Sequence, residues 1–262
     1  ALAYQGTDSD GFIKIFTLNA SFEISQTSSL EHDTADSAYN SLVLIDSTHL
    51  MLAYQQSDNS GHLKTFSIDG SYAVTQIDTF SVGAGISYNS LVKIAVNAGA
   101  ESYFALAYTG DSADGFIKTF SIDSAWDNIT LIDTLEHDTA DATWNSLVLL
   151  DSTHLMLAYM GTGGDGFITI FSVGVDGTSI TKTLDPPLEQ DGEYGSWNSL
   201  AKLTDTRVAL AYGGEDGDAQ AKTFDLDFSI TSGNFTITSA TVGADSEVSV
   251  LSTVASPTGT DI

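Results

Sequence analysis

The feature of this sequence that most constrains its fold is an internal repeat. The 22 residues from Asp33 to Tyr54 read DTADSAYNSLVLIDSTHLMLAY, and those from Asp138 to Tyr159 read DTADATWNSLVLLDSTHLMLAY, with four changes. The triplet Leu-Ala-Tyr occurs five times, at intervals of 50, 54, 51 and 53 residues. A regular period of this length is typical of solenoids and propellers, in which each repeat is one supersecondary unit.

Three short signatures divide each repeat into strands. An aromatic residue followed by Asn-Ser-Leu begins the first segment, Leu-Ala-Tyr ends the second, and GFIKTF or a variant begins the third. A looser fourth segment follows, such as ITLIDTL from Ile129. The alternation, the β-branched and aromatic content, and the Gly, Asp, Asn and Ser between segments all favour strands. Four strands in a unit of about 50 residues predict a β-propeller blade.

The two ends of the chain predict how such a ring closes. Leu2 lies in the second strand of a repeat, with no first strand before it. The segment that starts at Val242 aligns loosely with the one that starts at Val82 and leads into the third Leu-Ala-Tyr. We therefore predict that the Val248–Val254 strand pairs with the N-terminal strands. The alternative is an open array, in which this strand serves the next unit.

The predicted fold is thus an all-β, five-bladed β-propeller with four antiparallel strands per blade. Residues 1–262 form a single domain of five repeats of about 52 residues, one of them split between the termini. In the number and regularity of its repeats the sequence resembles five-bladed propellers, and most of all the tachylectin-type lectins. The resemblance covers essentially the whole chain and concerns architecture, because no Trp-Asp or kelch signature is present. It implies a sugar site in each repeat.

The composition limits the classes of partner. The net charge is −27, from 35 acidic and eight basic residues, so the surface repels nucleic acid and anionic membranes and favours cations. Cysteine is absent, and no apolar run is long enough to cross a bilayer. The chain begins at Ala1, inside a repeat and without Met, so we expect a piece of a longer product. We predict an extracellular or cell-surface location, with no bound nucleic acid and no membrane insertion.

The aromatic-Asn pairs at the head of the inner strands are the candidate ligand-binding residues. They are Tyr39, Asn40, Tyr88, Asn89, Trp144, Asn145, Trp197 and Asn198. In a propeller these side chains ring the mouth of the central channel, where flat aromatic faces stack on sugars and Asn bonds hydroxyl groups. The alternative is structural: the aromatics pack neighbouring blades together, and each Asn fixes the backbone of its loop.

The acidic loops between the second and third strands are candidate calcium sites. Their carboxylates are Asp8, Asp10, Asp111, Asp114 and Asp165. Calcium prefers several carboxylate oxygens on a tight turn that contains glycine, so no cofactor is required but Ca²⁺ binding is a prediction. The alternative is that Asp-Gly only forms a hairpin turn with positive φ. We place these loops on the same face as the acidic loops that precede the inner strands.

The histidines are predicted to make polar contacts in loops. His32 and His137 precede Asp33 and Asp138, and a second pair recurs in the DSTH turns. A His-Asp pair suggests catalysis, but no nucleophile in a distinctive turn accompanies either copy. The histidines of the DSTH turns are His49 and His154.

A glycosidase needs two carboxyl groups in different environments. The inner strands carry no acid that is unique to one repeat in their first half. Asp36, Asp141 and Glu193 are loop candidates that nothing in the sequence distinguishes. Three possible glycosylation sites, at Asn19, Asn128 and Asn234, fall in the connection between the third and fourth strands.

We therefore predict a protein that is not an enzyme: an adhesion or recognition module, lectin-like, whose repeated sites bind glycans or cell-surface polymers with avidity. The alternative is a structural repeat unit of an extracellular filament or tandem fibre, with copies of itself as partners. A glycoside hydrolase is the third interpretation.

Overall fold

The computed structural model describes residues 1–96, 101–215, 218–229 and 234–241. In these residues the chain is almost entirely β, and the strands form five separate antiparallel sheets. The described helical segments are three short 3-10 turns, and none of the described helices has the length and apolar character needed to span a membrane. The prediction of an all-β fold is confirmed.

The sheets follow one another along the chain. The first sheet contains β1 (Leu2–Gln5), β2 (Gly11–Leu18) and β3 (Ile24–Asp33); the second contains β4 (Ala38–Asp46), β5 (His49–Gln55), β6 (Ser60–Ile68) and β7 (Val74–Ala84). The third contains β8 (Ser87–Val96), β9 (Ser102–Thr109), β10 (Gly115–Ile122) and β11 (Ile129–Asp138). The fourth contains β12 (Thr143–Leu149), β13 (His154–Met160), β14 (Gly166–Ser172), β15 (Thr181–Lys182) and β16 (Leu188–Asp191); the fifth contains β17 (Ser196–Thr204), β18 (Arg207–Gly213), β19 (Ala219–Ser229) and β20 (Asn234–Thr241).

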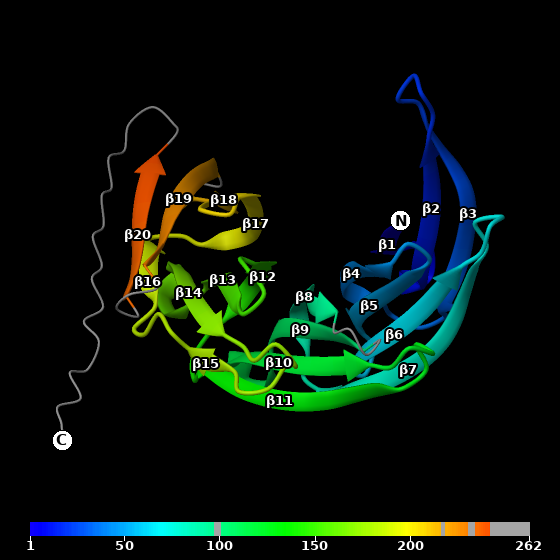
Figure 1. Ribbon diagram of the computed structural model, residues 1–262, viewed down its shortest axis with the longest axis horizontal. Coiled ribbons are helices and arrows are strands. Elements are labelled where there is room, and N and C mark those ends of the chain that lie inside the picture. The colour runs from blue at the N-terminus through cyan, green and yellow to red at the C-terminus, as the bar shows by residue number, and fades with distance from the viewer. Residues whose placement is uncertain (97–100, 216–217, 230–233, 242–262) are drawn as a thin grey trace.

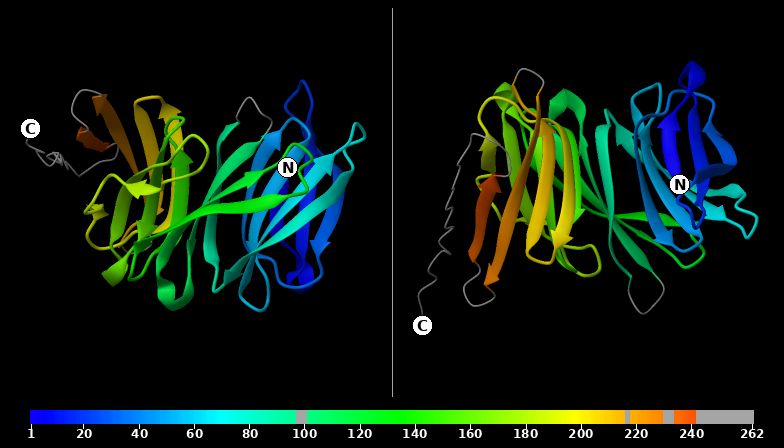
Figure 2. Two further views of the ribbon diagram at one scale, coloured as in Figure 1. Left: turned by 60° about the horizontal axis from the view of Figure 1, so that its bottom comes forward. Right: turned by 90° about the horizontal axis from the view of Figure 1, so that it is seen from above.

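The five sheets stand around an open arc (Figure 1), with β4, β8, β12 and β17 on its inner side. Each of these inner strands contacts the next, and β1 contacts β4. The first and fifth sheets lie at the two ends of the arc, on opposite sides of its opening (Figures 1 and 2). The strand predicted to close the ring, Val248–Val254, lies outside the described residues. Among the described residues the first sheet has three strands, and β1 pairs with β2 alone.

The core lies between neighbouring sheets, in four apolar clusters. Between the first and second sheets, Leu52 and Phe66 of the second pack with Ile13 of the first, and all three are fully buried. Ala53 points the other way, into the cluster shared with the third sheet. In β5, β9 and β13 the Leu-Ala-Tyr signature is therefore buried on both faces of the strand, with a small residue where two sheets approach closely. Each fully buried Leu or Phe contributes about 1.5–3 kcal/mol.

Candidate functional site

The aromatic-Asn pair forms a bulge in the inner strand of four sheets. In the second sheet the pairing of β4 with β5 passes from Ala38 opposite Gln55 to Ser41 opposite Ala53, so that Tyr39 and Asn40 leave the ladder. The same shift occurs in β8, β12 and β17. Bulges of this kind bend a strand and re-aim its side chains, and they are frequent beside functional sites.

All four aromatic residues of these bulges have a left-handed backbone. Their φ values are 51° at Tyr39, 51° at Tyr88, 54° at Trp144 and 56° at Trp197. Bulky residues rarely adopt φ above zero, so the surrounding contacts must hold each one in place. The sequence could not show this, because aromatic residues do not normally favour that conformation.

The four aromatic rings form a continuous row. The ring centroids are 4.6 Å apart from Tyr39 to Tyr88, 4.7 Å from Tyr88 to Trp144 and 3.9 Å from Trp144 to Trp197. The aromatics therefore do pack neighbouring sheets against one another, as the structural alternative predicted. The two ends of the row are the most open, with Tyr39 40% and Trp197 65% exposed.

The asparagines next to this row are fixed by backbone carbonyls. The Nδ2 group of Asn89 donates to the carbonyl of Tyr39, and that of Asn198 donates to the carbonyl of Trp144, both at 3.2 Å. Asn145 likewise donates to the carbonyl of Ala142 at 3.2 Å. A carbonyl can only accept, so these bonds determine which end of each amide is the NH₂ group.

As a result, several amide oxygens point away from the backbone without a partner. The Oδ1 atoms of Asn89, Asn145 and Asn198 are buried, and none has a hydrogen-bond partner among the described residues. Asn145 is only 8% exposed. In the second sheet, by contrast, Asn40 Oδ1 accepts a bond from Ser37 Oγ at 3.0 Å. A buried acceptor without a partner is destabilising, which makes each of these oxygens a candidate ligand contact.

Seven of the eight predicted ligand-binding residues line one pocket of about 170 Å³. They are Tyr39, Asn40, Tyr88, Asn89, Trp144, Asn145 and Asn198. Trp197 is not part of the lining, although it extends the aromatic row. The structure thus brings the predicted residues together, as one shared pocket rather than one site per repeat. The volume suits about five water molecules or a single sugar ring.

The Ser of the Asn-Ser-Leu signature joins successive inner strands. The Leu91 backbone N–H donates to Ser41 Oγ at 2.9 Å. The same bond recurs from Leu147 to Ser90 at 2.8 Å and from Leu200 to Ser146 at 2.9 Å. This series holds the four bulges at the same height and so aligns the pocket residues.

A Tyr-Asp-Lys cluster at the sheet boundaries was not predicted. Tyr54 Oη donates to Asp33 at 2.6 Å, and Lys64 lies 3.2 Å from the same carboxylate and 5.1 Å from the centre of the Tyr54 ring. Burial would raise the pKa of Asp33, but the bonds from Tyr54, the Ala35 N–H and Lys64 hold it below the usual value. The tyrosine pKa is raised by burial and by the bond to Asp33.

The Tyr-Asp bond of this cluster recurs at two further sheet boundaries, where among the described residues a lysine lies beside the carboxylate only at Asp191. Tyr159 bonds Asp138 at 2.9 Å and Tyr212 bonds Asp191 at 2.8 Å, each with the same separation of 21 residues. That constant spacing is the sequence signal that could have revealed the cluster. The boundary between the second and third sheets lacks this cluster, because Gly83 of β7 stands at the position of the Asp.

His32 makes a polar contact with the following loop, as predicted, because its Nε2 lies 3.5 Å from Ser37 Oγ. The prediction was wrong for His137, whose ring nitrogens have no partner among the described residues. Both histidines are buried, and each ring packs edge-on against a Tyr and a Phe. Burial lowers the pKa of each to about 4. A Cβ at Gly11 would lie 2.6 Å from the His32 ring, and one at Gly115 would lie 2.5 Å from the His137 ring, which explains the glycine that begins these two strands.

The histidines of the DSTH turns do make polar contacts in turns, as predicted. His49 Nδ1 lies 2.9 Å from Asp46, and His154 Nδ1 lies 2.9 Å from Asp151. His49 also stacks on Trp126, at 3.6 Å between ring centroids.

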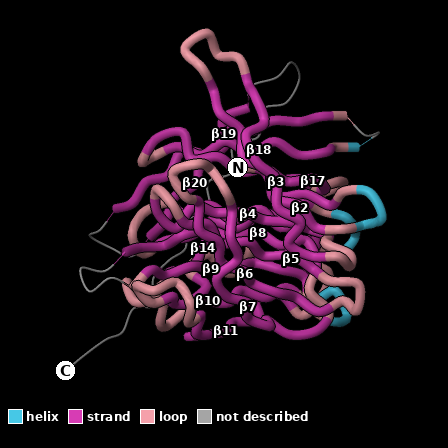
Figure 3. The backbone as a smooth tube through the Cα atoms, turned by 90° about the vertical axis from the view of Figure 1, so that its right-hand side faces the viewer, coloured by secondary structure: helices cyan, strands magenta, loops and turns pink. Residues whose placement is uncertain are grey.

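The predicted calcium loops form tight turns that close through the backbone. The Gly6 N–H donates to the Asp10 carbonyl at 2.8 Å, and the loops of Asp114 and Asp165 close in the same way. Positive φ falls on residues before the Asp-Gly pair, such as Asp8 and Ser9, and not on the glycine. In Figure 3 the three 3-10 turns η1 (Thr7–Ser9), η2 (Asp111–Ala113) and η3 (Thr162–Gly164), in cyan, lie along one side of the molecule.

These turns contact the connections that lead into the inner strands. The Ser37 N–H donates to the Ser9 carbonyl at 3.0 Å, and the Ala142 N–H donates to the Ala113 carbonyl at 2.9 Å. The two sets of acidic loops therefore share one face, as predicted. No group of three or more His, Cys, Asp or Glu side chains suited to a metal ion occurs within the described ranges.

Calcium binding by the Asp loops stays a prediction. If the carboxylates of Asp8, Asp111 and their equivalents bind the ion, calcium should raise the melting midpoint above that measured with a chelator. The Ala variant of Asp111 should then remove part of that difference. An identical midpoint with calcium and with chelator would mean that the loops are turns only.

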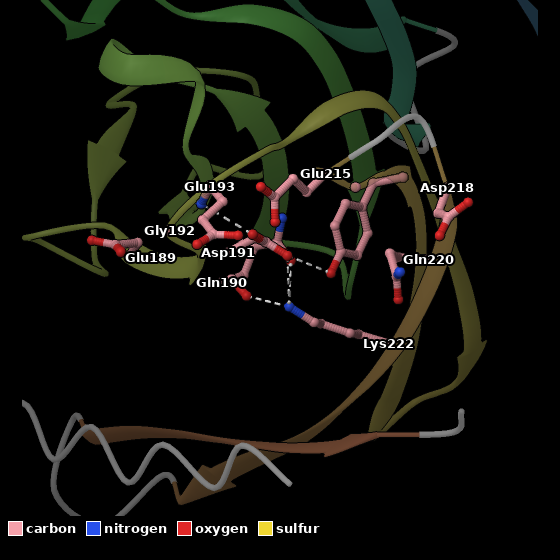
Figure 4. A pocket seen from close by; sticks show the side chains of 11 residues that line it. Glu189, Gln190, Asp191, Gly192, Glu193, Glu215, Asp218, Gln220 and Lys222 are labelled. Atoms are coloured by element: carbon pink, nitrogen blue, oxygen red, sulfur yellow. Dashed lines mark hydrogen bonds and ion pairs between the residues drawn. The ribbon is translucent and has the colours of Figure 1, made fainter. Parts of the chain in front are cut away.

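A larger acidic pocket, of about 750 Å³, lies between the fourth and fifth sheets (Figure 4). Its centre is the second Tyr-Asp-Lys cluster, formed by Tyr212, Asp191 and Lys222. The carboxylates that surround this centre are Glu189, Glu193, Glu215 and Asp218. The sequence predicted that acidic loops would gather on this face, but not that they would enclose a pocket.

The remaining candidate residues differ in exposure. Asp36 is partly buried, whereas Asp141 and Glu193 are exposed. Of the possible glycosylation sites, Asn128 is exposed, and exposed Asn19 caps its own turn by accepting bonds from the Ser21 and Glu23 N–H groups, both at 2.9 Å. Asn234 is the first residue of β20.

No protein-family model and no curated protein matches this sequence. Among solved structures, the chain is similar to a candidate 6-phosphogluconolactonase from Bacteroides fragilis, with 14% identity and a TM-score of 0.61 over 90% of this chain and 69% of that one. It is similar to the SapL1 lectin in complex with alpha methyl fucoside, with 14% identity and a TM-score of 0.55 over 93% and 76%.

A third similar structure is the NanB sialidase from Streptococcus pneumoniae, with 14% identity and a TM-score of 0.52 over 78% of this chain. The chain spans only 32% of the length of that sialidase. At this identity the likeness concerns the fold alone. The chain therefore has an all-β, propeller-like fold that resembles the fold of a lectin and of two proteins described as enzymes.

Proposed function

We propose that this protein is a glycan-binding module without enzymatic activity, which acts outside the cell or at its surface. The observation that carries the proposal is the set of unpartnered Oδ1 atoms on Asn89, Asn145 and Asn198, held beside an aromatic row in one pocket. Such oxygens need hydrogen-bond donors, and sugar hydroxyl groups are donors that also lie beside the apolar face of a ring. The likeness to a lectin bound to a fucoside supports the same class of ligand.

The described carboxylates favour binding over catalysis. Asp33, Asp138 and Asp191 occupy equivalent places and make equivalent bonds to tyrosines. A glycosidase needs two carboxyl groups whose environments differ, so that one is an acid while the other is a base or nucleophile. Asp33 and Asp191, each bound by a tyrosine and a lysine, repeat one environment, which opposes that division of roles.

A glycan array followed by calorimetric titration of the best ligand tests the proposal. We expect Tyr88→Ala to weaken binding at least about 10-fold, because Tyr88 lines the pocket between two other rings and a tenfold loss requires only about 1.4 kcal/mol of lost contact. Tyr72→Ala is the matched control, since Tyr72 also has positive φ but lies at a hairpin tip, 46% exposed. Absence of binding to every glycan, or equal weakening by both variants, would contradict the proposal.

The finer architecture belongs to the same proposal. The five sheets would be the five blades of one propeller, and Val248–Val254 would supply the missing inner strand beside β1, in the same chain or in a second copy. A second candidate function is that of a structural unit in an extracellular assembly of this chain. The exposure of apolar residues at both ends of the arc favours it.

A further inference from the structure

We infer that copies of this chain associate head to tail, with the fifth sheet of one copy packed against the first sheet of the next. The two surfaces are the two halves of the interface that already joins neighbouring sheets within the chain. The inference makes the second candidate function specific and does not depend on glycan binding.

The first sheet exposes residues that every later sheet buries. Leu2 is 49% exposed, and Phe16 is 37% exposed. The equivalents of Leu2 are Leu52, Leu106, Leu157 and Leu210, and those of Phe16 are Phe66, Phe120, Phe171 and Phe224, all of them at most 1% exposed. In later sheets these side chains pack against the sheet before. The first sheet therefore exposes the apolar face that every later sheet buries against the sheet before it.

The fifth sheet exposes the opposite half of the same interface. Ser199, Ala211 and Ala221 are cross-strand neighbours in one row of this sheet, and all three are exposed. In the second sheet the equivalent row is Ser41, Ala53 and Leu63. There the Ala and the Leu are at most 1% exposed, and the Ser binds the next inner strand. The fifth sheet therefore exposes the face that the second sheet buries against the third.

A third contact joins neighbouring sheets inside the chain, through the hairpin tips. In the third sheet the hairpin tip reaches back to the second, where the Trp126 carbonyl accepts a bond from Thr65 Oγ1 at 2.8 Å. The Gly177 carbonyl accepts the same kind of bond from Thr119 Oγ1 at 2.6 Å.

The first sheet carries the matching hairpin tip. Phe22 has φ 62° and donates its N–H to the Asn19 carbonyl, as Tyr72 does to Asp69 in the second sheet. The tip of the second sheet contacts the first, because the Tyr72 carbonyl accepts a bond from Ser28 Oγ at 2.6 Å. The hairpin tip of the first sheet is exposed to solvent, and the Phe22 side chain is 81% exposed.

A second copy is the occupant that this geometry favours. The two ends of the arc lie apart, on opposite sides of its opening, so the described residues of one chain do not bring them together (Figures 1 and 2). Two different surfaces that match each other make a heterologous contact, which forms a chain of copies unless its rotation closes a ring.

Charge should make the association depend on salt. Each copy carries a net charge of −27, so like charges oppose contact between copies. Salt screens this repulsion over about 10 Å at 0.1 M, whereas the apolar contact gains from burial at any ionic strength. We therefore expect association to increase with salt concentration.

Sedimentation velocity at rising protein and salt concentration, with electron microscopy of the same samples, tests the inference. The unmodified chain should form species larger than one copy, and Leu2→Glu and Ala221→Glu should each remain monomeric. Their mixture should form a complex of one copy of each, because every variant keeps one intact end. Leu131→Glu, at an exposed apolar position of the third sheet, is the control and should associate like the unmodified chain.

Three outcomes would overturn the inference. A chain that is monomeric throughout, with both end variants lowering the melting temperature, would show that the ring closes within one chain. A mixture that fails to associate would mean that the contact is not head to tail, and equal loss in Leu131→Glu would mean that it is not specific. Glycan titration of Leu2→Glu separates this test from the proposed function, since the pocket lies on other sheets.

Discussion

Replacing Asp33 by alanine is expected to lower the free energy of unfolding by about 3 kcal/mol. The side chains of Asp33 and Lys64 are each only 9% exposed, and their charged groups lie 3.2 Å apart. Removing one partner of a buried pair leaves the other charge without compensation, which costs more than the pair itself contributes. Urea denaturation of the variant and of the unmodified chain measures the difference.

Two comparisons identify the cause. The double variant Asp33→Ala/Lys64→Met removes both charges and should recover part of the loss, whereas Asp36→Ala in the same connection should change stability by less than about 0.5 kcal/mol. Because the folded pKa of Asp33 is lowered, its contribution is present above the usual carboxyl pKa and is lost as pH falls through the folded value. A double variant no more stable than Asp33→Ala would refute the role assigned to this pair.

Replacing His137 by valine is expected to protect the fold against acid. Burial lowers the pKa of His137 from 6.5 to about 4, so below pH 6.5 the unfolded chain takes up a proton that the folded chain does not. Stability from the neutral ring is therefore complete above pH 6.5 and falls as the pH drops to about 4, by about 3 kcal/mol. The variant should lack this loss.

The chain itself provides the precedent for this substitution. Val82 occupies the equivalent place in the second sheet, at the same bulge of β7, and is 7% exposed, so the site accommodates valine. Both ring nitrogens of His137 lack a partner among the described residues, so the variant should also be at least as stable near neutral pH. Urea denaturation between neutral pH and pH 4 provides the measurement. Equal slopes of stability against pH in both proteins would contradict the assignment.

The sequence alone determined the repeat and the strands. Alternating apolar residues and β-branched segments are local properties, so the predicted strand GFIKTFSI coincides with β10, Gly115–Ile122. The position of Tyr39 and its equivalents on one rim also followed from the repeat, because equivalent residues of a repeat occupy equivalent places.

The tertiary structure alone decided how these residues are used. The left-handed backbone at Tyr39 and the orientation of Asn89 arise from contacts with neighbouring sheets, about 50 residues away in sequence. The burial of His32 depends on Gly11 of another strand, a contact that no local pattern shows. The exposure of Leu2, identical in sequence context to the buried Leu52, depends only on whether a neighbouring sheet is present. The strands thus follow from local residue patterns. The pocket and the two exposed end sheets follow from the packing of sheets whose residues are far apart in the sequence.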